Sequence, residues 1–98
     1  MTHYTHETVF DALGDCAARW KWKANALYAE FCFSDFATAF AFMTKVAEVA
    51  EEMNHHPDWK NSYNRVAISL RTHDQNAVTD LDITLAKTIK KLAAVYKL

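Results

Sequence analysis

Apolar and polar residues recur along the chain with two different periods, and these separate the predicted helices from the predicted strands. Apolar residues return every three or four positions over residues 8–18, about 36–54 and about 83–96. Ser34 or Asp35 can cap the second of these segments by accepting its free N–H groups. The third follows a Thr-Asp-Leu-Asp stretch at residues 79–82, which resembles a capping box. Three amphipathic helices are therefore predicted.

The long middle helix is expected to face the core with one apolar stripe. That stripe consists of Phe36, Phe40, Met43, Ala47 and Ala50, and is widened by Val46 and Met53. The helix is predicted to end at about Asn54, because Pro57 cannot continue a helix and pushes the residue before it toward extended backbone.

Strict alternation of apolar and polar residues predicts four strands. A first strand over residues 20–23 and a second over 27–33 form a hairpin, joined by a turn at Ala24-Asn25-Ala26. The third and fourth strands are expected over residues 59–64 and 66–73. The faces that should pack on the helices consist of Leu27, Ala29, Phe31 and Phe33 in the second strand, and of Val66, Ile68, Leu70 and Thr72 in the fourth.

These elements follow in the order helix, hairpin, helix, strand pair, helix, which is an α+β arrangement. Apolar faces must be buried against one another. The expected architecture is therefore a four-stranded antiparallel sheet with three helices packed on one face (α-β-β-α-β-β-α). The other face of the sheet would be open, and its candidate residues are Tyr28, Glu30, Ser69 and Arg71.

Length and composition indicate one domain over residues 1–98, in which residues 1–6 have no apolar period and are expected to be a flexible end. A net charge of −1 offers no basic excess to attract nucleic acid or anionic lipid. Cys16 and Cys32 form no CxxC pair and are expected to be buried or half-buried free thiols. No secretory leader and no apolar run of roughly 20 residues is present, so a cytoplasmic protein is expected.

Candidate chemistry is concentrated in residues 51–59, which read Glu-Glu-Met-Asn-His-His-Pro-Asp-Trp. His55 and His56 directly precede Pro57, and His73 is predicted to close the fourth strand. The three histidines would then meet at one edge of the sheet. Histidine titrates at about pH 6.5, so it can give and take protons near neutrality.

The residues alone leave three interpretations of these histidines open. They could be exposed or capping side chains near a helix C-terminus, where imidazolium is favoured. They could form a zinc site, although adjacent ligands are awkward and no matching Cys or Glu spacing completes it. They could also form an acid/base pocket, in which Trp59 stacks on a flat heterocycle. Each neighbour also has a structural interpretation. Trp59 is more often a core residue than a ligand platform, and Asp82 is more often a helix cap than a catalytic carboxylate. Asn54 can cap the C-terminus of the helix.

The stretch Glu51-x-x-x-His55-His56-Pro57-x-Trp59 resembles the signature of the pterin-4a-carbinolamine dehydratases. Further stretches are similar to that family in the same order: Phe31-x-Phe33-x-Asp35-Phe36, Ala39-Phe40-x-Phe42-Met43-Thr44-x-Val46-Ala47, Tyr63-Asn64-x-Val66-x-Ile68-x-Leu70-x-Thr72-His73 and Asp82-Ile83-x-Leu85-Ala86. The resemblance covers about residues 20–93. It departs at Gln75-Asn76-Ala77-Val78, where many members have glycine in the turn.

The resemblance implies the same sheet with three helices on one face, and an enzyme that removes water from 4a-hydroxytetrahydrobiopterin to give quinonoid dihydrobiopterin in tetrahydrobiopterin recycling. Carried across by position, the active-site residues are His55, His56 and His73. The residues that would line the pocket or bind substrate are Asn54, Trp59, Arg71, Thr72 and Asp74. Glu51 and Asp82 become carboxylates that could orient imidazoles.

This reaction suits imidazoles. The C4a hydroxyl leaves once it is protonated, and N5 loses a proton as the double bond forms. Each proton transfer by a positioned side chain typically contributes about 10²–10⁴-fold. We expect His55 and His73 to do the acid/base work and His56 to position the pterin, with no metal or redox cofactor required.

The resemblance also implies a homo-oligomer, either a dimer or a tetramer. Some animal members act as dimerisation cofactors of a homeodomain transcription factor, through a helix surface that otherwise joins two dimers. A non-enzymatic coactivator module is therefore the alternative function, with a transcription-factor dimerisation helix as partner. No direct nucleic-acid or membrane partner is expected, and nuclear residence remains open beside the cytoplasm.

Overall fold

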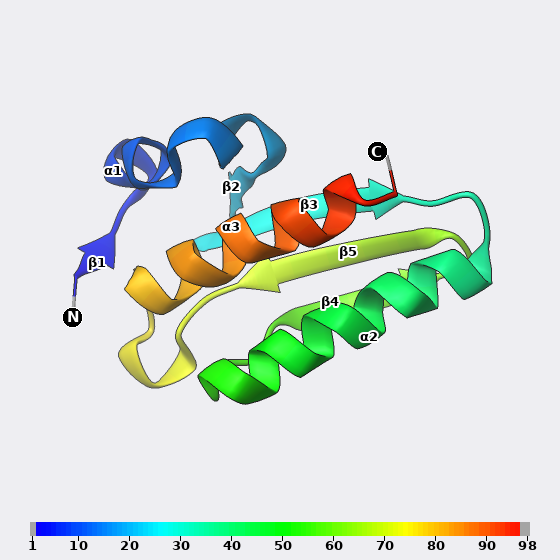
Figure 1. The fold of residues 1–98 in the computed structure, drawn as a ribbon. Coiled ribbons are helices and arrows are strands. Elements are labelled where there is room, and N and C mark those ends of the chain that lie inside the picture. Colours follow the sequence, from blue (N-terminus) through cyan, green and yellow to red (C-terminus); the bar gives the residue numbers. More distant parts are fainter. Residues whose placement is uncertain (1, 97–98) are drawn as a thin grey trace.

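The computed structural model describes residues 2–96, in which helices are layered on one face of an antiparallel sheet (Figure 1). The helices are α1 (His6–Leu13), α2 (Phe36–Met53) and α3 (Asp80–Ala94), with short 3-10 helices η1 (Gly14–Arg19) and η2 (His73–Gln75). The strands are β1 (His3–Tyr4), β2 (Lys21–Lys23), β3 (Ala26–Cys32), β4 (Asp58–Ser62), β5 (Arg65–Leu70) and β6 (Val78–Thr79).

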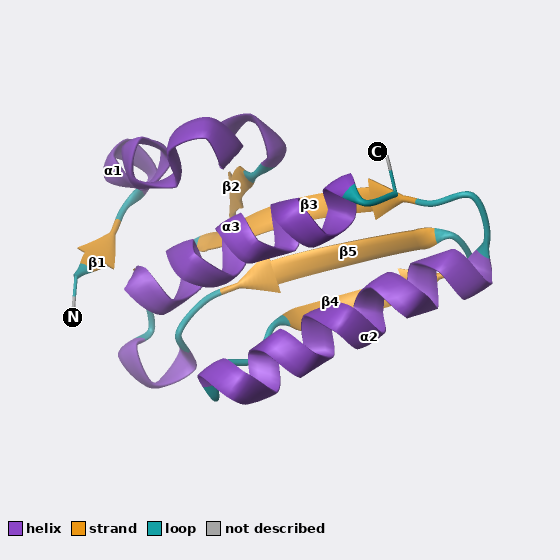
Figure 2. Cartoon of the chain, viewed as in Figure 1, coloured by secondary structure: helices purple, strands orange, loops and turns teal. Residues whose placement is uncertain are grey.

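The main sheet has the strand order β2-β3-β5-β4, and every neighbouring pair is antiparallel. Figure 2 shows α2 and α3 side by side in front of β3, β5 and β4. The predicted α+β class and the four-stranded antiparallel sheet are confirmed. The structure adds a second, two-stranded sheet formed by β1 and β6.

The core lies between this sheet and the helices. The predicted inward faces of β3 and β5 are confirmed, since Leu27, Ala29 and Phe31 are buried opposite Leu70, Ile68 and Val66 respectively. The predicted hairpin turn is also present between β2 and β3, with positive φ angles at Ala24 and Asn25.

The predicted buried stripe of α2 is wrong at its N-terminal end. Phe36 and Phe40 are 49% and 55% exposed. The helix buries Ala39 and Phe42 in their place, together with Val46 and Ala50, which were predicted. Phe42 packs on Phe31 and Phe33 of the strand layer, with ring centroids 5.2 and 4.9 Å away. Both stripes have helical spacing, so periodicity could not choose between them.

Within residues 1–6, which were expected to be a flexible end, His3–Tyr4 form β1 and pair with β6. The single N-terminal helix predicted over residues 8–18 is divided into α1 and η1 at Gly14, whose φ is +60°. Cys16 is a buried free thiol as expected, whereas the free thiol of Cys32 is exposed. No helix within residues 2–96 is long and apolar enough to cross a membrane.

Candidate active site

The site begins where α2 ends. Asn54 adopts a left-handed conformation (φ 51°, ψ 42°) and caps the helix, a position that asparagine tolerates well. The backbone N–H of His55 still donates to the carbonyl of Ala50 at 3.0 Å, so His55 is held against the last turn. Pro57 then leads directly into β4. This local geometry separates the two adjacent histidines, with His55 buried and His56 exposed.

The remaining histidine reaches the same end of the sheet from β5. Asp58 at the start of β4 pairs with Ser69 near the end of β5, and the chain continues into η2, which begins with His73. Nε2 of His73 lies 2.9 Å from Oδ2 of Asp58. The prediction that His73 closes a strand is wrong, because β5 ends at Leu70 and Thr72 makes only an isolated bridge to Ala77. The backbone turns at His73 to form the 3-10 helix.

His55 belongs to a buried polar network centred on Asp82, which is fully buried at the start of α3. Nε2 of His55 lies 2.6 Å from Oδ1 of Asp82. The hydroxyl of Thr72 donates to Oδ2 of Asp82 at 2.8 Å, and the N–H of Thr79 donates to the same oxygen at 2.9 Å. The hydroxyls of Thr72 and Thr79 are themselves 2.6 Å apart.

The directions of these hydrogen bonds follow from what each group can offer. An ionised carboxylate only accepts, so the ring nitrogen Nε2 of His55 must carry the proton that faces Asp82. Thr72 uses its hydroxyl proton on Asp82, so Thr79 donates its own to Thr72. The neutral tautomer of His55 then has its lone pair on Nδ1, which makes no hydrogen bond with residues 2–96.

His56 and His73 have the same kind of partner in a more exposed setting. Nε2 of His56 lies 2.6 Å from Oε2 of Glu51, with the two side chains 55% and 76% exposed. Glu51 and Asp82, the two carboxylates expected to orient imidazoles, therefore each contact one histidine. His73 and its partner Asp58 are similarly exposed. Each of the three histidines thus presents Nε2 to a carboxylate.

The other predicted site residues are distributed around this arrangement. Thr72 is part of the buried network, whereas Asn54 and Asp74 are exposed and Arg71 is half-buried. Trp59 lies opposite Ile68 and packs against the hydrophobic core, as expected if it is a core residue. The structure therefore connects Thr72 to His55 through Asp82, and places the remaining four outside the buried network.

Sequence reasoning missed two members of the site. Asp58 was an unassigned position between Pro57 and Trp59, and its contact with His73 depends on the pairing of β4 with β5. Thr79 was noticed only as the start of a capping box. The box is present, but Asp82 uses one oxygen to cap α3 and the other to bind His55. An Asp in place of the usual Glu or Gln was the only local signal.

The two-stranded sheet of β1 and β6 lies next to η2, the 3-10 helix that begins with His73, and contacts it. Nε2 of His3 lies 2.9 Å from Oε1 of Gln75 in η2, and the Tyr4 hydroxyl donates to Oδ1 of Asp80 at 2.6 Å. That hydrogen bond lowers the pKa of Asp80 below its usual value and raises the pKa of Tyr4. The N-terminal strand therefore fixes both ends of the segment between His73 and α3.

No three His, Cys, Asp or Glu side chains within residues 2–96 are grouped so as to hold a metal ion. The zinc arrangement of His55, His56 and His73 is therefore not formed in this part of the chain. Nε2 of each of the three faces a carboxylate.

Comparison with known proteins identifies this arrangement with one family. A family model described as pterin 4 alpha carbinolamine dehydratase matches residues 2–92. A protein from Synechococcus sp. (strain WH7803), named as a pterin-4-alpha-carbinolamine dehydratase, is 48% identical over 82 residues, which is 84% of this chain and 88% of that protein. A protein of the same name from Prochlorococcus marinus (strain MIT 9312) is 51% identical over 73 residues, 74% of this chain and 76% of that protein.

Solved structures agree. A transcriptional coactivator/pterin dehydratase from Brucella melitensis superposes with a TM-score of 0.84 at 40% identity, covering 94% of this chain and 99% of that one. A pterin dehydratase-like protein identified as a RuBisCO assembly factor in the alpha-carboxysome gives a TM-score of 0.63 at 25% identity, covering 76% and 87%. The family model that matches residues 2–92, together with the sequence identity and the shared fold, shows that this chain belongs to the pterin-4a-carbinolamine dehydratase family.

Proposed function

We propose that this protein is a hydro-lyase that converts 4a-hydroxytetrahydrobiopterin to quinonoid dihydrobiopterin in tetrahydrobiopterin recycling. The observation that carries the proposal is the buried His55–Asp82 pair at 2.6 Å, beside the exposed His73–Asp58 pair. An imidazole oriented by a buried carboxylate is a common way to prepare a general base. Family membership and the names of the relatives support the same reaction.

His55 is the base in this proposal. Asp82 holds its Nε2–H, so Nδ1 is the basic atom and takes the proton from N5 of the pterin. His73 is the acid and gives a proton to the C4a hydroxyl. The C4a–O bond then breaks, water departs, and the electron pair left by the N5 proton forms the C4a–N5 double bond. One proton must return from His55 to His73, through solvent, before the next turnover.

His56 positions the substrate. Its ring is 55% exposed and its Nε2 faces Glu51, so Nδ1 is left to accept a hydrogen bond from an N–H group of the pterin. Asn54, Trp59, Arg71, Thr72 and Asp74 complete the proposed pocket. Thr72 acts through Asp82 rather than on the pterin, because its hydroxyl is already committed to that carboxylate.

The test is a stopped-flow dehydration assay in which a hydroxylase generates the carbinolamine immediately before mixing. His55→Ala and His73→Ala are expected to reduce kcat by about 10²–10⁴-fold each, and His56→Ala is expected to raise KM more than it lowers kcat. His6→Ala is the matched control, since His6 stacks on Trp22 away from these carboxylates. Wild-type rates in His55→Ala or His73→Ala would remove that residue from the mechanism.

An interaction module is the second candidate function, and a specific observation favours it. Phe36 and Phe40 lie on the exposed side of α2 with their ring centroids 6.0 Å apart, although large apolar side chains are usually buried. We propose that this face joins copies of the chain into a dimer or tetramer in the cytoplasm. A transcription-factor dimerisation helix would bind the same face. A related coactivator/pterin dehydratase and a related assembly factor support such a role.

The two functions can be separated with two variants. A variant in which His55 and His73 are both replaced by alanine should lose dehydratase activity and keep its oligomeric state. A protein in which Phe36 and Phe40 are replaced should change its assembly while its histidine pairs stay intact. If the wild-type protein forms oligomers but does not accelerate dehydration, the interaction module is its function.

A further inference from the structure

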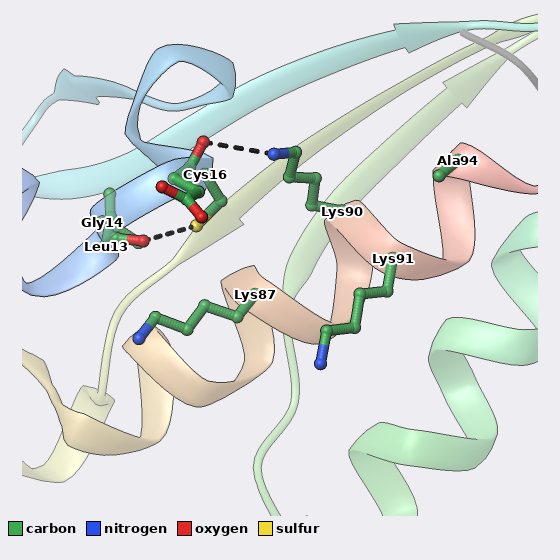
Figure 3. Close-up of a pocket in the computed structure, with 8 residues that line it drawn as sticks. Leu13, Gly14, Cys16, Lys87, Lys90, Lys91 and Ala94 are labelled. Carbon is green, nitrogen blue, oxygen red and sulfur yellow. Dashed lines mark hydrogen bonds between the residues drawn. The ribbon is translucent and has the colours of Figure 1, made fainter.

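A groove of about 580 Å³ lies between η1 and α3, and none of the residues assigned to the histidine site lines it. Lys87, Lys90 and Lys91 of α3 form one wall, and Gly14 and Cys16 lie on the other (Figure 3). Its volume falls in the range of small-molecule sites, roughly 300–1,000 Å³. The groove is therefore large enough for an organic ligand.

The wall formed by α3 carries a concentration of positive charge. The three lysines are spaced three and four residues apart, so they emerge from one face of the helix. Lys90 donates to the backbone carbonyl of Asp15 at 3.1 Å, whereas Lys87 and Lys91 make no ion pair or hydrogen bond with residues 2–96. Asp15 supplies the one carboxylate in the lining, so the groove has a positive excess.

The helix dipole accounts for Lys91, which lies in the last turn of α3, but not for Lys87. Cations near a helix C-terminus are favoured by the helix dipole, but that effect falls off within the last turn. Lys87 lies about two turns before Ala94, where α3 ends. Like charges four residues apart, such as Lys87 and Lys91, destabilise a helix when nothing lies between them. An anion between the two ammonium groups would remove that repulsion.

The opposite wall is shaped to receive the rest of a ligand. Gly14 has φ +60°, and a Cβ placed on it would meet no atom within 4 Å, so the backbone is open to the groove there. Leu13 and Cys16 beneath it are 1% and 4% exposed and form an apolar floor. An inorganic phosphate would engage the lysines but leave this floor uncovered.

We propose that the groove binds a phosphorylated small molecule of about nucleotide size, with its phosphates between Lys87 and Lys91 and its apolar part over Gly14. This site is separate from the dehydratase chemistry and does not depend on it. Lys90 shapes the groove by holding η1 against α3. The ligand is defined by this chemistry: a di- or triphosphate joined to a flat or apolar body.

Gly14 makes the test direct because it is the only glycine in the chain. Protein labelled with ¹⁵N-glycine gives a single amide signal, and that signal comes from the groove wall. The probes are ATP with EDTA, pyrophosphate, and adenosine, each titrated at matched ionic strength. We expect a saturable shift with a Kd below about 1 mM for ATP, weaker binding of pyrophosphate, and no shift with adenosine alone.

Two double variants with the same charge change provide the control. Lys87→Gln with Lys91→Gln removes the proposed phosphate ligands and keeps the Lys90 hydrogen bond. Lys21→Gln with Lys45→Gln removes two exposed charges elsewhere. The first pair should weaken ATP binding at least tenfold, and the second should leave it unchanged. The proposal would be overturned if ATP caused no shift, if both double variants lost ATP affinity equally, or if pyrophosphate bound as tightly as ATP. The dehydration rate should be unaffected in both double variants.

Discussion

Asp82→Asn is the most informative change in this protein, because it preserves the shape of the buried network and alters one hydrogen bond. The amide oxygen of the new side chain can keep the two donors that now reach Oδ2, from Thr72 and Thr79. Its NH₂ group would then face Nε2 of His55, which lies 2.6 Å from the carboxylate in the native protein. Two N–H donors cannot bond, so His55 must move its proton from Nε2 to Nδ1.

The expected magnitudes follow from these contacts. The hydrogen bond to His55 changes from one with a charged group, worth about 1.5–3 kcal/mol, to one between neutral groups, worth about 0.5–1.5 kcal/mol, and loss of a negative charge in the first turn of α3 costs about 0.3–1 kcal/mol. The variant should therefore be about 1–3 kcal/mol less stable, which leaves a domain of ordinary stability folded. Dehydration should fall about 10²–10⁴-fold, because Nδ1 of His55 then carries a proton and cannot act as a base.

Urea unfolding followed by circular dichroism measures the first effect, and stopped-flow dehydration measures the second. Asp80→Asn is the matched control, since Asp80 occupies the same helical turn but contacts Tyr4 rather than a histidine. It should share the small dipole cost and retain full dehydration. Wild-type dehydration in folded Asp82→Asn, or an equal loss in Asp80→Asn, would refute the role assigned to the buried pair.

Two further predictions concern other contacts. Tyr4→Phe removes the hydrogen bond that lowers the pKa of Asp80 in the folded protein. A carboxyl group with a lowered pKa stabilises the fold at any pH above its unfolded pKa, which is 3.8 for Asp80. That stabilisation is lost as the pH falls through the pKa of the folded state. The variant should therefore unfold at lower urea than wild type at neutral pH, with the difference shrinking below pH 3.8; a difference independent of pH would contradict this. Replacing Phe36 and Phe40 together by Ser should reduce the mass measured by light scattering. Tyr63→Ser, which changes a side chain 65% exposed, should not, and an unchanged mass in both would argue against the α2 interface.

Much of the fold could be predicted from neighbouring residues, because local spacing determines it. The inward faces of β3 and β5 follow from strict alternation. Short polar side chains before an apolar run left Ser34 or Asp35 as the cap of α2, and the structure has Asp35. The His-His-Pro motif carried the resemblance that named the three histidines. The same resemblance named Glu51 and Asp82 as carboxylates that could orient imidazoles, but the structure decided that Asp82 contacts His55 and Glu51 contacts His56.

The sequence by itself determined the types and order of the helices and main strands and the identity of the histidines, since each of these depends on a few adjacent side chains. Only the tertiary structure decided which face of α2 is buried, that β1 pairs with β6, and that Asp58 reaches His73. Those outcomes depend on contacts between segments far apart in the chain. Alternative stripes and registers have the same local spacing, and they differ in energy only once the sheet and helices are packed together.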